Sequence, residues 1–435
     1  MQMSETIRIY KGNIMFATDK DNLIEIPNGV IVVQNNKVLG AYPELPGEYN
    51  GAPEENFGDM LIIPGFVDIH LHAPQYENLG LGLDKELMPW LDAYTFPEEA
   101  KFADTAYAKR VYERFVYDIW ESGTTRAAVY GTIHKDATEM LCNLFHDNNM
   151  GAAVGKVNMD RNCPEGLRED TAKSLSDTEA FINKVTGYSL LVKPVITPRF
   201  ALACSDMLMA GLGKLARVYN LPIQSHLSEN KKEIQFVAEL YKNEANYASV
   251  YDRFGLLDGG KTIMAHCVHN TDDEIGLLKR KDVFVAHCPV SNIDLSSGLA
   301  PVKRYLSYGL RVGIGSDISG GHTLFMPKCV TAAIETSKTY SMAIDDQYGN
   351  LSLTEAFFLA TKGGGGFFGR VGSFEPGYEF DALVIDDIRT RGVNPRALFE
   401  RLQKFMYNGT KQDIVKRFVC GKHITMERGA AGYGL

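Results

Sequence analysis

The chain has 435 residues, of which 45% are hydrophobic and 23% are charged, and its formal net charge is −9. This composition is typical of a globular protein with a large buried core. Because the balance is acidic and no basic cluster offsets it, we expect neither nucleic acid nor an anionic membrane as a partner.

The N-terminal segment and the cysteines indicate the compartment. The first residues, MQMSETIRIYKGN, contain no apolar stretch of the kind found in a secretory signal. No segment reaches the roughly 18 consecutive apolar residues that a membrane span needs. The seven cysteines are scattered and form no CxxC pair, which is typical of reduced thiols. We therefore expect a cytoplasmic protein.

Short strand-like runs separated by polar turns occupy both ends of the chain. Near the N-terminus they are IRIYKG, NLIEI and GVIVVQNNKVLGAY, with a hairpin expected at Asn35 and Asn36. Near the C-terminus, GSFEPGYEFDALVID and KRFVCGKHIT have the same character. The pattern predicts a small β-sandwich domain built from both termini, with residues 1–63 as its first part and residues 370–435 as its second.

Between these parts, residues 64–369 alternate apolar runs with amphipathic segments. The eight runs with strand character are LIIPGFVDIH, TTRAAVYGT, GAAVGKVNMD, LLVKPVIT, LPIQSH, KTIMAHC, DVFVAHCP and RVGIGSD. Segments such as DEIGLLKRK and APVKRYLSYG lie between them and are amphipathic. The alternation predicts an α/β fold with a (β/α)8 TIM-type barrel as the catalytic domain. A doubly wound open sheet is the alternative, but no glycine-rich phosphate-binding motif follows the first run.

Polar residues gather at or just beyond the C-terminal ends of these runs. In chain order they are His70, His72, Asp160, Arg199, His226, Glu229, His266, His287 and Asp317. In a TIM-type barrel the C-terminal strand ends form the rim that carries the active site. We therefore expect these side chains to meet in one place.

Four of these residues form a candidate metal site. His70 and His72 can point to the same side of a strand, because side chains two residues apart do so. With His226 and Asp317 they would give three imidazoles and one carboxylate, which suit a divalent metal and leave a position for water. The ordinary interpretations are a surface or packing pair for the first two, a hydrogen-bonded core histidine for His226 and a helix N-cap for Asp317.

Glu229 is a candidate for proton transfer. It follows His226 by three residues, so a helical turn would place both on one face and bring the carboxylate beside a metal-bound water. The alternative is a surface glutamate that starts the polar helix HLSENKKEIQ. Other metal motifs, HExxH and PCxxC, are absent from the sequence, as is a GxxxxGK[ST] phosphate loop.

Several segments resemble a known superfamily. PGFVDIHLH resembles the first-strand signature of the amidohydrolase superfamily, and GIGSD resembles its eighth-strand aspartate. More narrowly, HLHAPQY, WLDAYTFP, VGKVNMDRNCPE, KPVITPRFALACS, IQSHLSEN, AHCPVSNIDLSSG and GIGSDISGG resemble the guanine deaminase family. The resemblance runs from about Leu61 to Asp381 and includes the split β domain. Val290 in HCPVSN and His322 after SGG depart from it.

The resemblance implies one Zn²⁺ per chain, with Fe²⁺ as the alternative metal. The ligands would be His70, His72, His226 and Asp317. Some superfamily members hold two metals bridged by a carbamylated lysine on the fourth strand. Lys193 is the nearest candidate here, but it lies early in its run, away from the rim. The resemblance therefore implies a mononuclear site.

The remaining roles also come from the resemblance. Glu229 would shuttle protons, and His266 would hydrogen-bond the metal-bound water or the intermediate, with Asp317 helping to orient that water. The residues that would bind the purine are Gln75, Arg199 and Phe200. For Arg199 the alternative is that it merely pairs with a carboxylate at the rim.

The activity implied is hydrolytic deamination of guanine to xanthine and ammonia by a metal-activated water, since a bound Zn²⁺ lowers the pKa of its water to about 7. The alternative is a deaminase or hydrolase of a related aminopurine, pterin or triazine on the same scaffold. A noncatalytic association module is a remote alternative, because all four ligands and the glutamate are present. The implied partners are a small purine substrate and a second copy of the chain in a homodimer.

Overall fold

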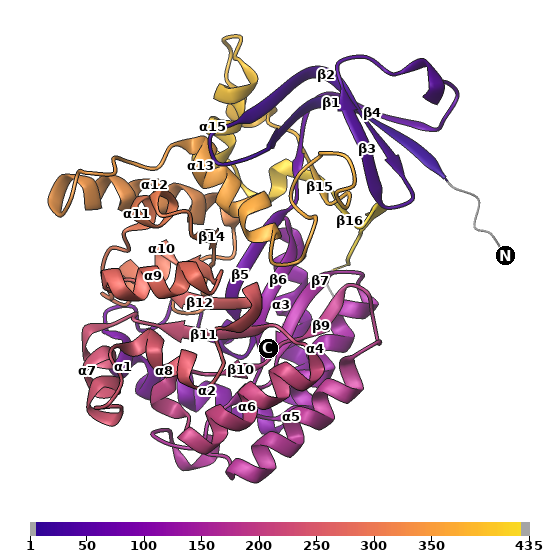
Figure 1. Ribbon diagram of the computed structural model, residues 1–435. Coiled ribbons are helices and arrows are strands. Elements are labelled where there is room, and N and C mark those ends of the chain that lie inside the picture. Colours follow the sequence, from indigo (N-terminus) through magenta and orange to yellow (C-terminus); the bar gives the residue numbers. More distant parts are fainter. Residues whose placement is uncertain (1–5, 428–435) are drawn as a thin grey trace.

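The strands from both ends of the chain join in one mixed sheet in the computed structural model, which describes residues 6–427. Figure 1 shows the indigo N-terminal strands beside the orange and yellow C-terminal ones. The order is β17-β16-β15-β4-β1-β2-β3. Their bounds are β1 Ile7–Ala17, β2 Leu23–Gln34, β3 Lys37–Tyr42, β4 Glu54–Pro64, β15 Ala382–Ile385, β16 Ile414–Val419 and β17 Lys422–His423. The predicted hairpin is confirmed, because Gln34 pairs with Lys37 around Asn35, whose φ is 57°.

The β domain predicted from both termini is built on one hydrogen-bonded strand order within residues 6–427. Its arrangement as a β-sandwich stays a prediction. Its aromatic cluster packs Tyr10 against Phe380 and Phe418, with ring centroids 4.5 and 5.1 Å away. The same cluster includes Val38 of β3 and Val384 of β15, which stand in opposite halves of the strand order.

Eight parallel strands at the predicted apolar runs form the centre of the molecule. One sheet has the order β5-β6-β7-β9 and the other β11-β12-β13-β14. Their bounds are β5 Phe66–His72, β6 Thr124–Tyr130, β7 Gly151–Gly155, β9 Val192–Pro194, β11 Ile223–Leu227, β12 Thr262–His266, β13 Phe284–His287 and β14 Arg311–Ile314. The short strands β8 (Val157–Asn158) and β10 (Thr197–Pro198) pair with each other, and one bridge joins Ile196 to Ile223. The first run holds two strands, because its LIIP segment ends β4.

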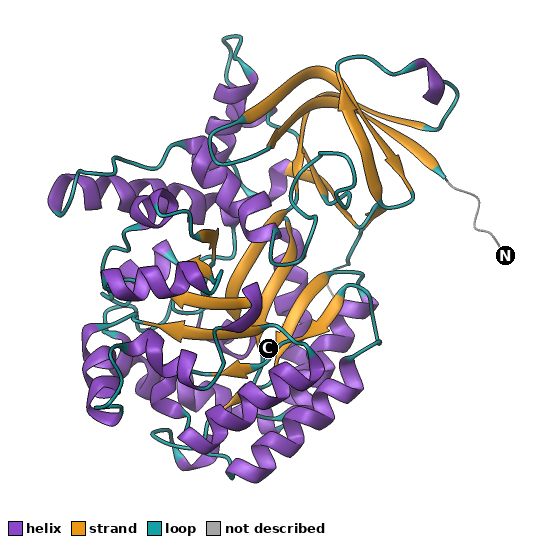
Figure 2. Ribbon diagram, in the orientation of Figure 1, coloured by secondary structure: helices purple, strands orange, loops and turns teal. Residues whose placement is uncertain are grey.

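Helices surround the central strands (Figure 2). Their bounds are α1 Leu87–Trp90, α2 Phe96–Ala100, α3 Thr105–Glu121, α4 Lys135–Asp147, α5 Thr171–Val185, α6 Asp206–Tyr219, α7 Lys231–Leu240, α8 Tyr247–Arg253, α9 Asp272–Arg280, α10 Pro289–Asp294, α11 Val302–Ser307, α12 Met326–Ala343, α13 Leu353–Phe358, α14 Ile388–Arg391 and α15 Leu398–Asn408. Local sequence sets their ends. Helix α9, for example, begins with a capping box between Thr271 and Glu274 and ends in two basic residues. Among the described residues, no helix has both the length and the apolar composition of a membrane span.

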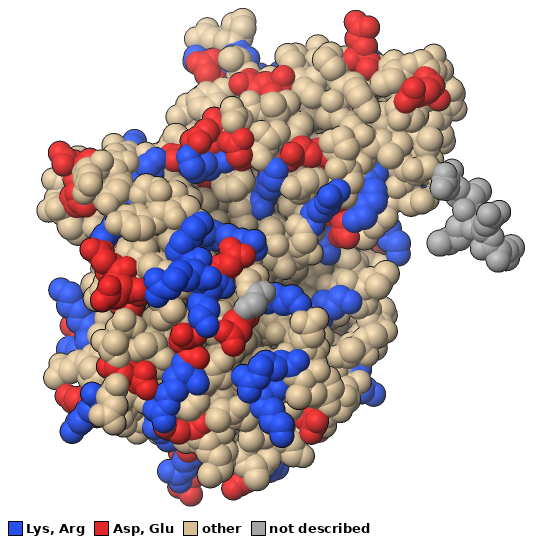
Figure 3. Space-filling model, viewed as in Figure 1, with Lys and Arg blue, Asp and Glu red and all other residues tan. Residues whose placement is uncertain are grey.

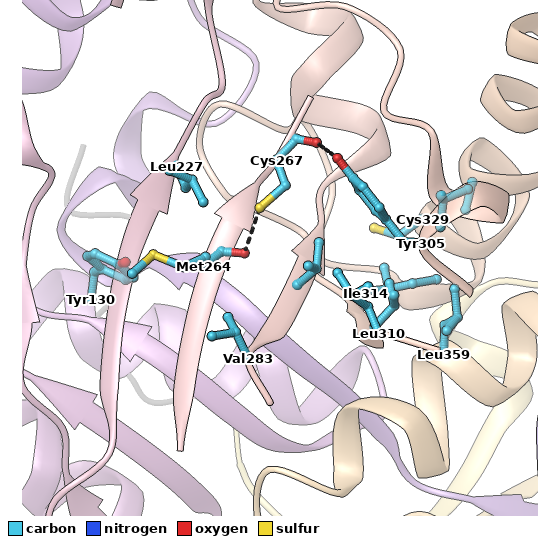
Figure 4. Packing of buried hydrophobic residues seen from close by; sticks show 14 of the residues in the cluster. Tyr130, Leu227, Met264, Cys267, Val283, Tyr305, Leu310, Ile314, Cys329 and Leu359 are labelled. Carbon is cyan, nitrogen blue, oxygen red and sulfur yellow. Dashed lines mark hydrogen bonds between the residues drawn. The ribbon is translucent and has the colours of Figure 1, made fainter. Parts of the chain in front are cut away.

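A hydrophobic core lies between the sheet β11–β14 and the helices outside it (Figure 4). Leu227, Met264 and Ile314 are fully buried in it. Complete burial of such a side chain contributes about 1.5–3 kcal/mol. The hydroxyl of Tyr305 donates a hydrogen bond to the backbone carbonyl of Cys267, one residue beyond β12. The core therefore fixes the C-terminal ends of these strands, where the polar residues lie.

Charged side chains of both signs are interspersed on the face shown in Figure 3. Many of the charges on the surface pair, as Lys281 does with Asp252 and Asp258 at 2.6 and 2.8 Å. Exposed pairs of this kind stabilise a fold by only about 0–1 kcal/mol each. A surface of mixed sign also attracts a polyanion less than a basic patch would.

Candidate active site

The C-terminal ends of β5, β11, β12 and β14 bring their polar side chains together, as the sequence predicted. Nε2 of His72 lies 3.1 Å from Nε2 of His226, and Nε2 of His70 lies 3.1 Å from Oδ1 of Asp317. The same carboxylate oxygen lies 3.4 Å from Nε2 of His72. All four residues are largely or fully buried. Three imidazoles and one carboxylate therefore meet in a small volume at the ends of these strands.

The donor atoms of this cluster fit a metal ion. Single ring nitrogens of His70, His72 and His226 all lie within 4.8 Å of one another. Nδ1 of His70 is buried and has no hydrogen-bond partner among the described residues, and its Nε2 has only the carboxylate of Asp317 beside it. A buried polar atom without a partner is costly unless another group satisfies it. Nδ1 of His226 lies 2.5 Å from the backbone carbonyl of Arg199. Because a carbonyl only accepts, this bond leaves the Nε2 lone pair of His226 free for a cation.

The charges of the cluster agree with such a site. Burial lowers the pKa of His72 and of His226 well below the usual value, so both imidazoles are neutral, as metal ligation requires. Burial alone would raise the pKa of Asp317, but the neighbouring His70 and His266 outweigh it and hold that pKa well below its usual range. The arrangement therefore supplies three neutral nitrogen donors and one ionised oxygen donor.

Several residues at the rim have a left-handed backbone that is uncommon outside glycine. The φ angles of Ser228, His266, Cys267 and Asp317 are 50°, 70°, 49° and 48°. Such conformations cost roughly 1–3 kcal/mol each and cluster at functional sites. At Asp317 the backbone is fixed by its amide, which donates to the carbonyl of His70 at 2.8 Å.

Glu229 lies beside the cluster, but not through the helical turn that the sequence suggested. Helix α7 begins only at Lys231, and the left-handed Ser228 turns the chain so that Glu229 enters the site. Burial raises the pKa of Glu229 to about 7. Its Oε2 lies 3.5 Å from Nε2 of His266, which is 3.7 Å from Oδ2 of Asp317. A proton could therefore move among these groups with little rearrangement.

A cavity of about 390 Å³ opens onto this cluster. Its lining residues are His72, Gln75, Leu87, Trp90, Leu91, Arg199, Phe200, His226, Glu229, His266, Leu295 and Asp317. The apolar side of the lining comes largely from α1 and from the turn of π-helix that follows it at Leu91–Thr95. The three residues expected to bind a purine thus face the same space as the acid–base residues and the metal-type cluster.

Comparison with known proteins agrees with this geometry. The model of the amidohydrolase family matches residues 61–424. The chain is 36% identical to a guanine deaminase of Dictyostelium discoideum, covering 98% of this chain and 99% of that protein, and 35% identical to the human guanine deaminase, covering 97% and 98%. A guanine deaminase of C. acetobutylicum, solved with guanine bound in its active site, superposes with a TM-score of 0.94 at 48% identity over 97% of this chain and 100% of that chain.

The chain belongs to the amidohydrolase family. In this amidohydrolase, the structure shows the carboxylate pair that was the alternative for Arg199, while purine binding by Arg199 stays a prediction. Its Nη1 donates to Oε2 of Glu99 at 2.6 Å, so it pairs with a carboxylate, and it also lines the cavity. The other oxygen of Glu99 accepts from Nε2 of Gln75 at 2.9 Å.

Four supporting residues of the amidohydrolase site were not identified from the sequence. Glu99 is one of them. The other three lie on or just after α10: Ser291 donates to Oδ2 of Asp317 at 2.5 Å, Asn292 accepts from Nδ1 of His266 at 2.9 Å, and Ser297 donates to Oε1 of Glu229 at 3.0 Å. Ser291, Asn292 and Ser297 stand in AHCPVSNIDLSSG, which carries the family resemblance, whereas Glu99 lies two residues beyond another such segment, WLDAYTFP.

Other polar residues near the strand ends do not reach the cavity. Asp160 instead accepts from the backbone and hydroxyl of Ser205, at the start of α6. His287 is buried apart from the cavity lining, and His322 pairs with Asp294 at the surface. Lys193 is exposed and donates to the carbonyl of Ser189, so its amine lies away from the cluster.

Proposed function

We propose that this amidohydrolase hydrolyses guanine to xanthine and ammonia. The observation that carries the proposal is one cavity, onto which the buried cluster opens through His72, His226 and Asp317. Glu229, Arg199, Gln75 and Phe200 line the same cavity. Its relatives over nearly the whole chain are guanine deaminases, and the relative from C. acetobutylicum holds guanine in its active site.

The cluster would hold one Zn²⁺ or, as the alternative, one Fe²⁺. The ligands would be His70, His72, His226 and Asp317. When bound, the metal supplies a Lewis acid that lowers the pKa of water toward 7 and so provides a nucleophile at neutral pH. We favour a single metal because the set has three nitrogens and one oxygen, and because Lys193 is exposed and distant from it.

The protein residues move the protons. Glu229 accepts a proton from the attacking water and delivers it to N3 as the oxygen adds to C2 of guanine. The second proton of that oxygen must then reach the 2-amino nitrogen, so that the C2–N bond breaks, ammonia leaves and C2 becomes the carbonyl of xanthine. Glu229 and His266 are placed for this second transfer. A carboxyl group with a pKa of about 7 can act in both directions at neutral pH.

Arg199 and Gln75 would recognise the purine by hydrogen bonds. Guanine presents two acceptors, O6 and N7, on one edge, and the guanidinium group has only donors in a planar fork. Gln75 offers a donor and an acceptor to the opposite edge, and Phe200 lies near the ring face. Adenine would place an amine against the donors of Arg199 and has no amino group at C2 to lose.

We also propose that the eight central strands close into one (β/α)8 barrel. On one side, the amide of Ser316 donates to Oδ1 of Asp68 at 3.0 Å, and a Cβ on Gly315 would lie 2.8 Å from that of His70, which supports close packing of β14 on β5. On the other side, the bridge between Ile196 and Ile223 supports continuity with β11. The barrel would span residues 64–369, with 1–63 and 370–435 forming the β domain.

A homodimer, which the family resemblance implies, is a further point of the proposal, and size-exclusion chromatography with light scattering tests it. The cytoplasmic location expected from the reduced cysteines is another.

The test is the conversion of guanine to xanthine followed by ultraviolet absorbance and ammonia release, with and without prior chelation. We expect guanine to be deaminated and adenine to be turned over at least ~10⁴-fold more slowly, because adenine leaves buried donors unpaired. Arg199→Lys should lose much of the activity on guanine, since an ammonium group cannot form the planar fork. Turnover of another aminopurine, a pterin or a triazine in preference to guanine would refute the proposal.

A further inference from the structure

Glu99 lies behind the cavity and contacts two of its lining residues at once. It belongs to α2 and is buried. One carboxylate oxygen accepts from Nη1 of Arg199 at 2.6 Å, and the other accepts from Nε2 of Gln75 at 2.9 Å. Glu99 itself does not line the cavity. It is therefore placed to control both residues without reaching a ligand.

The contact to Arg199 fixes the plane and the charge of the guanidinium group. The side chain of Arg199 is only 4% exposed, and a buried cation without a partner is strongly unfavourable. Guanine is neutral and cannot supply the missing charge, so the pair with Glu99 must do so. The ring of Phe96, on the same helix, lies 5.3 Å from the guanidinium carbon. Because the group is planar, holding one of its nitrogens and one of its faces leaves the other donors in a defined direction.

The contact with Glu99 fixes the orientation of the Gln75 side-chain amide, that is, which end is the NH2 group and which is the carbonyl oxygen. A carboxylate only accepts, so the group that faces Glu99 must be the NH2 end. The carbonyl oxygen of Gln75 then lies 3.3 Å from the backbone amide of Ser319, which donates to it. The amide keeps one N–H and one lone pair for a ligand, in an orientation that Glu99 determines.

We propose that Glu99 is a positioning residue that sets the hydrogen-bonding pattern with which Arg199 and Gln75 select an oxo-purine. The inference rests on the proposed function, because it assumes that Arg199 contacts O6. Glu99 acts through its two partners and does not take part in proton transfer. Replacing it should therefore weaken selection of O6 more than it weakens the chemical step.

Glu99→Gln tests this with little change of shape. A glutamine would leave Arg199 without its counter-charge. Its NH2 group would face a donor, either the guanidinium group of Arg199 or the NH2 group of Gln75, which could then turn over. The matched control is Glu98→Gln on the same turn of α2. Glu98 is also buried, but it pairs with Lys101 and Tyr107 and does not contact the cavity lining.

The measurement is kcat/KM for guanine and for 2-aminopurine, which carries hydrogen in place of O6, in the wild type and both variants. We expect Glu99→Gln to reduce the guanine to 2-aminopurine ratio by about tenfold or more, as loss of an oriented bond to a charged group does. Most of the change should appear in KM for guanine. Glu98→Gln should keep the ratio within about twofold of wild type, because it does not alter Arg199 or Gln75.

The ratio does not depend on how much of a preparation is folded, since both substrates meet the same active fraction. A purely structural role would lower the melting temperature and both activities equally, and this result would overturn the inference. If Glu99→Gln gives no folded protein, the same ratio of kcat/KM values is measured for Glu99→Asp. This variant keeps the charge on a shorter side chain. A wild-type protein that releases no ammonia from guanine would instead refute the proposed function, and the inference with it.

Discussion

Glu229 is buried and also lines the cavity, and both properties suit it to proton transfer. Burial raises its pKa to about 7, while the neighbouring His266 partly opposes the shift. The hydroxyl of Ser297 donates to one carboxylate oxygen at 3.0 Å and leaves the other oxygen toward His266. A carboxyl group held in this way can take a proton from water and return it to a ring nitrogen. The geometry therefore fits general acid–base catalysis better than metal ligation.

Glu229→Gln should keep the metal and the affinity for purine but lose most turnover. Glutamine has nearly the same shape and cannot relay a proton, so kcat should fall by ~10²–10⁴-fold or more. Steady-state kinetics on guanine, together with elemental analysis of the variant, measure both effects. A variant within about threefold of wild-type kcat would remove Glu229 from the mechanism, because general acid–base catalysis is worth far more than that factor.

His226→Ala should remove metal and activity together. The imidazole supplies one of four donors and is oriented by the carbonyl of Arg199, so no other group of the described site replaces it. Wild-type protein should contain one divalent metal per chain by elemental analysis, and the variant far less. Two metals per wild-type chain would contradict the mononuclear site. Retention of full metal content by the variant would exclude His226 as a ligand.

Site residues that stand in a recognisable sequence pattern could be predicted, and those without such a pattern could not. His70 and His72 stand two apart on a strand, and this spacing alone places them on one side. Glu99 has no such spacing relative to Gln75 or Arg199, which it contacts only after the chain has folded. Glu229 was placed correctly but for the wrong reason, because the left-handed turn at Ser228 cannot be read from serine.

The segment from α10 to Ser297 has one function that its individual contacts do not reveal. Ser291, Asn292 and Ser297 each form a hydrogen bond to a different group of the site, namely Asp317, His266 and Glu229. One short segment thus orients all three acid–base side chains. Because an amide oxygen only accepts, Asn292 fixes the tautomer of His266 with hydrogen on Nδ1 and leaves Nε2 toward the carboxylates.

Asn292→Leu should therefore impair catalysis without removing a residue that touches substrate. Loss of the acceptor frees the tautomer of His266, and loss of such an orienting partner typically costs about 10–100-fold in activity. We expect the loss mainly in kcat, measured on guanine. Ile293→Ala is the matched control, because Ile293 is 50% exposed on the same helix and should leave kinetics unchanged. Equal kinetics in wild type and Asn292→Leu would show that this hydrogen bond has no positioning role.

Strands that form apolar runs were predictable, and very short helices were not. The eight strands stood out because each is a near-continuous apolar run, as expected for strands buried on both faces. Helices α1 and α2 are four and five residues long and are joined by a turn of π-helix. Segments of that length show no periodicity, so their pattern does not place Leu87 and Trp90 at the cavity or Glu99 behind it.

The β domain and the central strands are linked by a buried ionic network. Nε and Nη2 of Arg126, on β6, donate to the two oxygens of Asp381 at 2.6 and 3.0 Å, and Nη2 also donates to Glu379 at 2.6 Å. Burial opposes the charge of Arg126, but the two carboxylates outweigh burial and raise its pKa. Asp381 also accepts from the amide of Cys420 at 2.7 Å, so it binds the last strands to the centre.

The sequence predicted that both ends form one domain but not how that domain attaches. The alternation of hydrophobic and polar residues indicates which face of a strand is buried. It does not indicate which strand lies beside it. The pairing of β4 with β1 and β15, and hence a single sheet, depends on contacts between residues far apart in the chain, such as Ile63 with Leu383. Arg126 likewise stands in an apolar run, where nothing in the run identifies its partner.

Arg126→Met tests this attachment. Removing one partner of a buried pair leaves Asp381 as an uncompensated buried charge, and such losses cost about 3–5 kcal/mol. We expect the midpoint of urea unfolding, measured by circular dichroism, to fall accordingly. The kcat on guanine should not change. The double variant Arg126→Met/Asp381→Asn should be less destabilised than the single one, because Asp381 no longer carries an unpaired charge.

The control is Lys37→Met, which removes the ion pair between Lys37 and Glu379. The side chain of Lys37 is 43% exposed, so the free energy of unfolding should change by only about 0–1 kcal/mol. If Arg126→Met and Lys37→Met shift the midpoint equally, the buried network does not hold the two parts of the molecule together.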